Sequence, residues 1–108
     1  MPRNARALAG SLSDEERVAW RDLQRMPNIG PAMAYDLLRL GIRRSDDLAG
    51  RDPDALYADL GRLDGVRHDP CVRDVFAAAV GYAETGESQP WWHFTPERKE
   101  REEAGRAS

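Results

Sequence analysis

The sequence has a single cysteine, Cys71, in its 108 residues. One thiol cannot form a disulfide within the chain, and such low cysteine content is typical of proteins from a reducing compartment. The sequence also lacks any apolar run near the ~20 residues that a membrane-spanning helix needs, and no long apolar segment follows the basic N-terminus as it would in a signal peptide. We therefore expect a cytoplasmic protein with no membrane partner.

Positive charge is not in excess either. The chain has 16 Lys and Arg against 19 Asp and Glu, a formal net charge of -3 and a pI of about 5.4. Proteins that coat nucleic acid through their overall field are basic, so any DNA contact here must be local. Between residues 21 and 51, six arginines and four aspartates give a local net charge of +2. This local excess is either scattered helix surface charge or a patch that faces phosphates.

The composition predicts one folded domain with loose ends. The sequence is 41% hydrophobic and 32% charged, which is polar but not depleted enough in apolar residues for disorder throughout. Residues 1–11 have no periodic pattern and are interpreted as a flexible leader. A helical domain is expected over 12–95, with an aromatic strap at 91–95, and residues 96–108 form a charged tail that we expect to be frayed.

Helix start and stop signals predict an all-α compact bundle of about five helices. Ser13 with Glu16 matches a capping box, Ser45 is expected to cap the short third helix, and Gly41 and Gly86 are placed as left-handed residues that end helices. The expected helices cover residues 13–26, 31–40, 45–49, 53–63 and 70–85. Their apolar stripes are expected to face one core and include Val18 in the first helix and Leu63 in the fourth, whereas Trp20 is expected at the edge of the core.

The hairpin at residues 26–34 is the part of the sequence that best indicates a function. Pro27-Asn28 ends one helical pattern, Gly30 is expected to supply a backbone turn that a residue with a Cβ resists, and Pro31 begins the next helix. The pattern resembles the helix-hairpin-helix motif. The matching positions are Met26, Pro27, Ile29, Gly30, Pro31, Ala34, Leu37, Leu38, Gly41 and Ile42.

This resemblance implies DNA binding that does not depend on sequence. Backbone N–H groups of the hairpin and of the following helix would bind a phosphate oxygen, which positions a protein on DNA without reading bases. Asn28 replaces the first glycine of the pattern, and Ala32 occupies a position where DNA-binding members often have Lys or Arg. The expected phosphate-binding residues are Asn28, Ile29, Gly30, Ala32 and Met33, with Arg25, Arg43 and Arg44 near neighbouring phosphates.

The alternative function is a protein–protein interaction module that uses the hairpin only as scaffold. At least two of the three aromatic residues Trp91, Trp92 and Phe94 are expected to pack back onto the bundle. Aromatic residues can also stack on unpaired bases, which is the other interpretation of this segment. A partner would dock on this strap, and the protein is expected to be a monomer or a weak homodimer.

Residues 63–70 are interpreted as a second, degenerate hairpin with a structural role. Asp69 is expected to cap the next helix, and His68 to bond the hairpin backbone. Together with Cys71, these two residues are candidate metal ligands, and Cys71 is also a candidate nucleophile. One Cys and two His lack the paired spacing of a zinc site, and the acid beside Cys71 opposes a thiolate. We therefore expect no enzyme activity, no metal and no cofactor.

The whole chain is similar to a family of small bacterial proteins. The resemblance covers residues 17–99 and rests on the hairpin, on the turn at residues 68–72 (His-Asp-Pro-Cys-Val) and on the ending at 91–98 (Trp-Trp-His-Phe-Thr-Pro-Glu-Arg). These features together resemble the pathogenicity-locus family, some members of which carry a mitomycin-resistance label. The resemblance supports a helix-hairpin-helix fold and implies no established activity.

Overall fold

The structure is a computed structural model that describes residues 9–88, 90–96, 98–100 and 102. The predicted all-α fold is confirmed, and the described residues contain no strand. The elements are α2 (Asp14–Leu23), α3 (Pro31–Arg39), the 3₁₀-helix η1 (Ser45–Leu48), α4 (Pro53–Asp64), α5 (Cys71–Thr85) and the 3₁₀-helix η2 (Trp91–Phe94).

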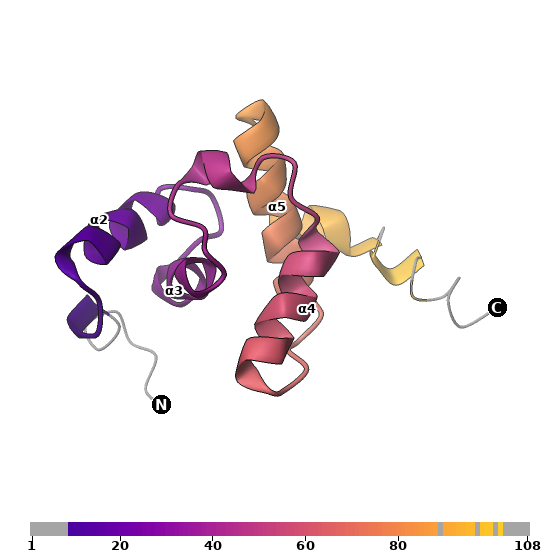
Figure 1. The fold of residues 1–108 in the computed structure, drawn as a ribbon. Coiled ribbons are helices and arrows are strands. Elements are labelled where there is room, and N and C mark those ends of the chain that lie inside the picture. The colour runs from indigo at the N-terminus through magenta and orange to yellow at the C-terminus, as the bar shows by residue number, and fades with distance from the viewer. Residues whose placement is uncertain (1–8, 89, 97, 101, 103–108) are drawn as a thin grey trace.

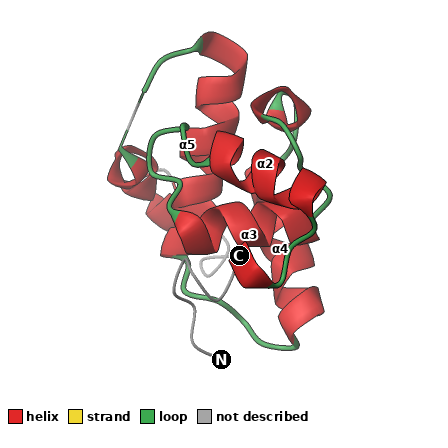
Figure 2. Ribbon diagram, turned by 90° about the vertical axis from the view of Figure 1, so that its left-hand side faces the viewer, coloured by secondary structure: helices red, strands yellow, loops and turns green. Residues whose placement is uncertain are grey.

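The helices form two pairs that share one core. α2 packs against α3 and α4 packs against α5, while both η1 and η2 contact α5. Figure 1 shows α2 and α3 on one side and α4 and α5 on the other, with η1 above the junction, and Figure 2 shows the same elements after a quarter turn. The core side chains are Leu12, Trp20, Leu23, Met26, Ile29, Ala34, Leu37, Leu38, Ile42, Leu48, Leu56, Leu60, Phe76, Ala79 and Val80.

The capping box at Ser13 and the two left-handed helix ends are confirmed. The Ser13 side chain accepts a hydrogen bond from the Glu16 N–H at 3.2 Å, and the Glu16 carboxylate accepts one from the Ser13 N–H at 3.0 Å. Gly41 and Gly86 adopt left-handed conformations with φ of 87° and 76°. These signals act within a few residues, so tertiary packing does not override them.

Two helix boundaries differ from the prediction. α2 ends at Leu23 rather than near Met26, because Pro27 disfavours a helical conformation for the residue before it and cannot donate a helix hydrogen bond itself. Ser45 is not the cap of the third helix but its first residue. The carboxylate of Asp47 instead accepts hydrogen bonds from the backbone of the two residues before Ser45, at 3.1 and 3.2 Å.

Two residues assigned to the core are exposed. Val18 is 61% exposed and Leu63 is 55% exposed, so both assignments are wrong. Trp20 and Leu23 are instead the buried residues of α2, at 5% and 0% exposure. Val18, two positions before Trp20, points about 200° away around the helix axis. Leu63 lies in the last turn of α4, at the end that reaches farthest from the other helices in Figure 1.

The aromatic strap contacts α5, and among its described aromatic side chains Phe94 packs there, whereas at least two of the three aromatic residues were expected to pack. Phe94 is half-buried and its ring lies over Gly81, whereas Trp92 is 60% exposed and the side chain of Trp91 lies outside the described residues. The charged segment that follows also reaches α5, because Arg98 donates hydrogen bonds to the buried carboxylate of Asp74. No helix in the part of the chain that the structure describes is long and apolar enough to cross a membrane.

Candidate nucleic-acid interface

The turn between α2 and α3 has its unusual backbone conformation at Asn28. Asn28 has a φ of 69°, which is in the left-handed region, whereas Gly30 is extended with φ -91° and ψ -173°. The prediction that Gly30 supplies the turn geometry is therefore wrong, since any residue can adopt an extended backbone. Asparagine tolerates the left-handed region better than most residues, which explains why this turn forms without its first glycine.

Buried side chains fix the turn in place. Met26 and Ile29 are 3% and 5% exposed, so both pack inward, whereas Asn28 and Gly30 between and beside them are exposed. The indole of Trp20 donates a hydrogen bond from Nε1 to the carbonyl oxygen of Pro31 at 2.9 Å. This bond joins the middle of α2 to the first residue of α3. The turn is thus held from both helices.

The N-terminus of α3 has the properties of an anion-binding site. Gly30 is the N-cap residue and provides no side-chain cap, and the first turn of α3 contains no acidic residue. Gly30 is exposed, and no atom lies within 4 Å of the position where a Cβ would be. The helix dipole places partial positive charge here, and Pro31 at the first helical position starts the helix without a donor. Ala32 and Met33 are half-buried beside it.

Two of the three predicted arginines meet beside the turn. Arg25 and Arg44 line a hollow of about 320 Å³ whose wall includes Met26. Their nearest carboxylates are those of Asp22, 4.0 Å from Arg25, and Asp46, 3.6 Å from Arg44. All four side chains are more than half exposed. Exposed ion pairs of this kind contribute about 0–1 kcal/mol, so they restrain the arginines little.

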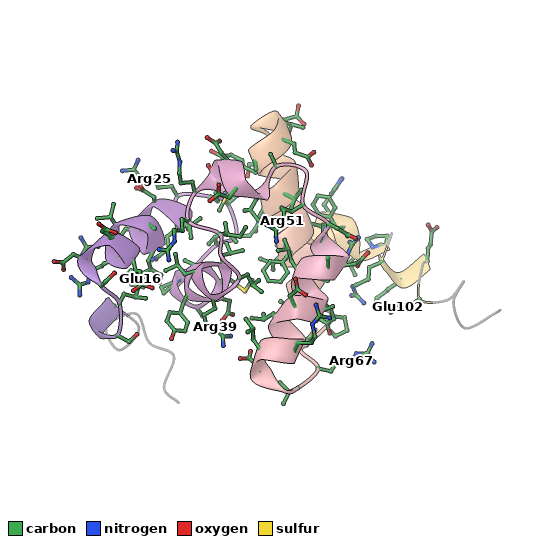
Figure 3. The ribbon with its side chains drawn as sticks, viewed as in Figure 1. Glu16, Arg25, Arg39, Arg51, Arg67 and Glu102 are labelled. Carbon is green, nitrogen blue, oxygen red and sulfur yellow. The ribbon has the colours of Figure 1, made fainter. Side chains whose placement is uncertain are left out.

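Arg43 lies elsewhere. It does not line the hollow, and its charge acts on Glu16, near the start of α2. The pKa of Glu16 is lowered chiefly by the hydrogen bond from the Ser13 backbone, and Arg43 adds to this effect. The structure therefore brings Arg25 and Arg44 together at the hollow, and Arg43 does not join them there. Figure 3 labels Arg25 and Glu16.

Two residues at this site were not predicted to belong to it, namely Tyr82 and Trp20. Tyr82 comes from α5 and lines the same hollow as Arg25. No local pattern could link Tyr82 to the turn, because the two are far apart in the sequence. Trp20 was expected at the edge of the core, whereas it is buried and bonded to the turn. Its spacing from Leu23, three residues later, was the available signal.

The loop between α4 and α5 has a structural role in this geometry. Asp69 accepts a hydrogen bond from the Cys71 N–H at 2.9 Å, although the N-cap position of α5 is Pro70 rather than the predicted Asp69. The prediction that His68 bonds the loop backbone through its ring is wrong. Its Nε2 atom lies 2.6 Å from Asp64 Oδ2, and its backbone oxygen accepts a hydrogen bond from the Tyr57 hydroxyl.

Asp64 is also the point at which the two helix pairs are joined. Arg39 of α3 donates from Nη1 and Nη2 to the two carboxylate oxygens of Asp64, at 2.6 and 3.0 Å. These hydrogen bonds, with a smaller contribution from His68, lower the pKa of Asp64 from 3.8 to about 2. The carboxylate therefore stabilises the folded state above pH about 4, and this contribution is lost as the pH falls toward 2.

We expect the stability difference between the wild type and Asp64→Asn to depend on pH. At neutral pH the variant should be less stable, because Arg39 loses its charged partner. Below pH 3.8 the Asp64 carboxylate becomes protonated in the unfolded chain, whereas in the folded protein it stays ionised until the pH is about 2. The two free energies of unfolding should therefore converge as the pH falls from about 4 to 2. Urea unfolding across this range measures the difference. A difference that stays constant with pH would mean that the charge of Asp64 is not its source.

The candidate nucleophile and metal ligands do not form a reactive site. Burial raises the pKa of the Cys71 thiol, and the hydrogen bond and charge of Asp69 raise it further. A raised pKa disfavours the thiolate that nucleophilic chemistry requires. Among the described residues, no group of three or more His, Cys, Asp or Glu side chains is arranged to hold a metal ion.

Comparison with known proteins identifies the family. Residues 16–100 match the family model described as "Pathogenicity locus" (Cdd1). The chain belongs to the pathogenicity-locus family. The resemblance drawn from the hairpin, the second turn and the double-tryptophan ending is thereby confirmed.

One relative in this family is from Streptomyces lavendulae. It is named "Mitomycin resistance protein McrB" and is 42% identical over 78 residues, which cover 72% of this chain and 74% of the relative. The mitomycin-resistance label expected for some family members is present in that name. No solved structure matches the chain.

Proposed function

We propose that α2, the turn and α3 form a helix-hairpin-helix motif that binds the DNA backbone without sequence preference. The observation that supports this proposal best is the N-terminus of α3, whose N-cap residue Gly30 is exposed and has no side chain to cap it, and whose first turn contains no acidic residue. A phosphate oxygen carries the charge that the helix dipole favours at this position. The expected role is non-enzymatic, in keeping with the raised pKa of Cys71.

The open space at Gly30 indicates that this glycine has a role other than the backbone conformation of the turn. Its backbone does not need glycine, and no neighbouring atom within 4 Å excludes a Cβ. A side chain at this position would instead occupy the space in front of the helix N-terminus. Glycine allows a ligand to approach the backbone closely. The residue is therefore better explained by a phosphate contact than by the conformation of the turn.

Arg25 and Arg44 are the side chains that we expect to assist. Both line the hollow beside the turn, and the carboxylates near them form only exposed pairs. Exchanging such a pair for a phosphate contact costs little. The two aspartates in the same hollow oppose a strong local field, so we expect weak binding that salt reduces further.

The test compares Gly30→Glu with the wild type in titrations of a labelled DNA duplex at low and moderate salt. Wild type should bind, and its affinity should fall as salt rises, because each neutralised phosphate releases counterions. Glutamate at position 30 places a carboxylate where the phosphate would lie. We expect it to reduce the affinity by about tenfold or more, which corresponds to about 1.4 kcal/mol.

Gly10→Glu is the matched control. Gly10 has no atom within 4 Å of its Cβ position and no positive φ, so the substitution adds the same charge with the same freedom. It precedes α2, and the ten residues of that helix, about 15 Å long, separate it from the turn. Equal losses in the two variants would show that binding follows net charge rather than the turn. No binding by a folded wild-type protein would overturn the proposal.

The second candidate is a protein-interaction module, and the exposure of Trp92 favours it. A tryptophan that is 60% exposed is unusual for a residue whose burial is strongly favourable, and aromatic residues are enriched at protein interfaces. If wild type binds no DNA in the titration above, the hairpin is scaffold. Protein partners of the strap, including a second copy of the chain, then become the leading explanation.

A further inference from the structure

A second cleft with a different composition lies between α4, α5 and the C-terminal segment. Its volume is about 310 Å³. Its lining includes three arginines, two carboxylates and one tyrosine, namely Arg67, Arg73, Arg98, Asp54, Glu102 and Tyr57. Figure 3 places Arg67 and Glu102 on the side of the molecule opposite Arg25, so this cleft is separate from the turn between α2 and α3.

Arg73 is the buried wall of this cleft, and its guanidinium is only partly satisfied. Its side chain is 7% exposed, and Nε donates a hydrogen bond to Asp54 Oδ1 at 2.9 Å. The Nη1 atom lies 3.7 Å from the carboxylate of Asp74, which is too long for a hydrogen bond. Nη1 is buried and has no hydrogen-bond partner among the described residues. A buried donor without an acceptor is unfavourable, so the Arg73 guanidinium has hydrogen-bonding capacity that the described residues do not use.

The other two arginines add donors on the same cleft. Arg98 is 12% exposed and uses Nε for Asp74 and Nη1 for Glu102, at 3.0 Å each. Arg67 is exposed and forms no ion pair with any residue that the structure describes. Each guanidinium has five N–H donors in a planar fork, and the neighbouring carboxylates accept only some of them. The N–H donors that remain can form hydrogen bonds with an oxyanion.

We propose that this cleft binds a small molecule that carries a phosphate or carboxylate group. The planar forks of arginine match the oxygens of both groups, and Tyr57 supplies an aromatic wall for the rest of the ligand. The two carboxylates on the cleft wall, Asp54 and Glu102, would repel the continuous negative charge of a DNA backbone. A single small anion, in contrast, can contact the arginines without passing close to these two carboxylates.

The test follows the arginine Nε–H resonances of the full chain by NMR during a titration with inorganic phosphate, and then with acetate. We expect saturable shifts at Arg73 and Arg98, because both residues line the cleft. Arg67→Gln should weaken binding by about tenfold, since it removes a charged donor. Arg67 is exposed, so this variant should fold.

Arg62→Gln is the control, because Arg62 is 72% exposed on α4 and does not line the cleft. It should leave phosphate binding unchanged. Shifts that never saturate, or equal losses in both variants, would overturn the proposal. So would shifts caused by duplex DNA but not by phosphate, which would make the cleft a nucleic-acid contact. Gly30→Glu should bind phosphate as the wild type does, so this proposal can fail or succeed independently of DNA binding by the turn.

Discussion

Asp74→Ala is expected to lower the free energy of unfolding by about 3–5 kcal/mol, because it removes one partner of a buried charge network. The Asp74 side chain is 0% exposed. Its Oδ2 atom accepts hydrogen bonds from Thr95 Oγ1 at 2.8 Å and from Arg98 Nε at 3.0 Å. Without the carboxylate, Arg98 loses its charged partner while it remains largely covered, and Arg73 loses its neighbour. Urea unfolding followed by circular dichroism measures the loss.

Asp59→Ala is the control for this prediction. Asp59 is partly exposed and pairs with Arg62 on the same helix, so its loss should change stability by about 0.5 kcal/mol or less. A second measurement is limited digestion with trypsin. Because Asp74 holds Arg98, cleavage after Arg98 or Lys99 should be faster in Asp74→Ala than in Asp59→Ala. Equal stability losses in the two variants would show that the buried network makes no special contribution.

This network could not be predicted from the sequence. The apolar residues of α5, such as Phe76 and Val80, fall at helical spacing and are buried as expected. Arg73 and Asp74 lie between Val72 and Val75 in the sequence and would be assigned to a solvated face. The C-terminal segment covers Asp74 with Thr95 and Arg98, and Arg73 bonds Asp54 of α4. Periodicity reports that one face of a helix is apolar, and it cannot report that another chain segment covers the polar face.

Short-range chemistry was predicted more successfully. The capping box at Ser13 and the left-handed glycines depend only on residues close to one another in the sequence, and the structure contains both. The errors at Val18 and Leu63 have another origin. Both residues are apolar at helical spacing, but burial depends on where the neighbouring helices lie. The spacing of apolar residues along the sequence does not contain that information.

The candidate site shows the same division. The turn was located correctly, but the left-handed conformation belongs to Asn28 rather than to Gly30. Sequence spacing grouped three arginines, and the fold brings only Arg25 and Arg44 to one hollow. Arg43 and Arg44 are adjacent in the chain, yet their side chains serve different parts of the surface. Adjacent side chains diverge wherever the backbone is extended, as it is at Arg44 before η1.

Trp20→Ala is expected to destabilise the protein by about 3–5 kcal/mol, the range typical of large aromatic truncations in a core. Trp20 is 5% exposed, so the substitution leaves a cavity between α2 and the turn. It also removes the hydrogen bond from Nε1 to the Pro31 carbonyl. Trp20→Phe keeps most of the apolar volume and removes the donor, so its loss should be smaller, about 1 kcal/mol from the hydrogen bond plus a packing contribution. Denaturant unfolding of both variants measures these values.

Val18→Ala is the matched control for Trp20→Ala. Val18 lies two residues earlier in α2 and is 61% exposed, so its truncation should change stability by about 0.5 kcal/mol or less. If Trp20 fixes the N-terminus of α3 for phosphate binding, Trp20→Phe should also weaken DNA binding under conditions in which it stays folded, and Val18→Ala should not. A Trp20→Ala loss close to that of Val18→Ala would mean that the indole is not the anchor between the two helices.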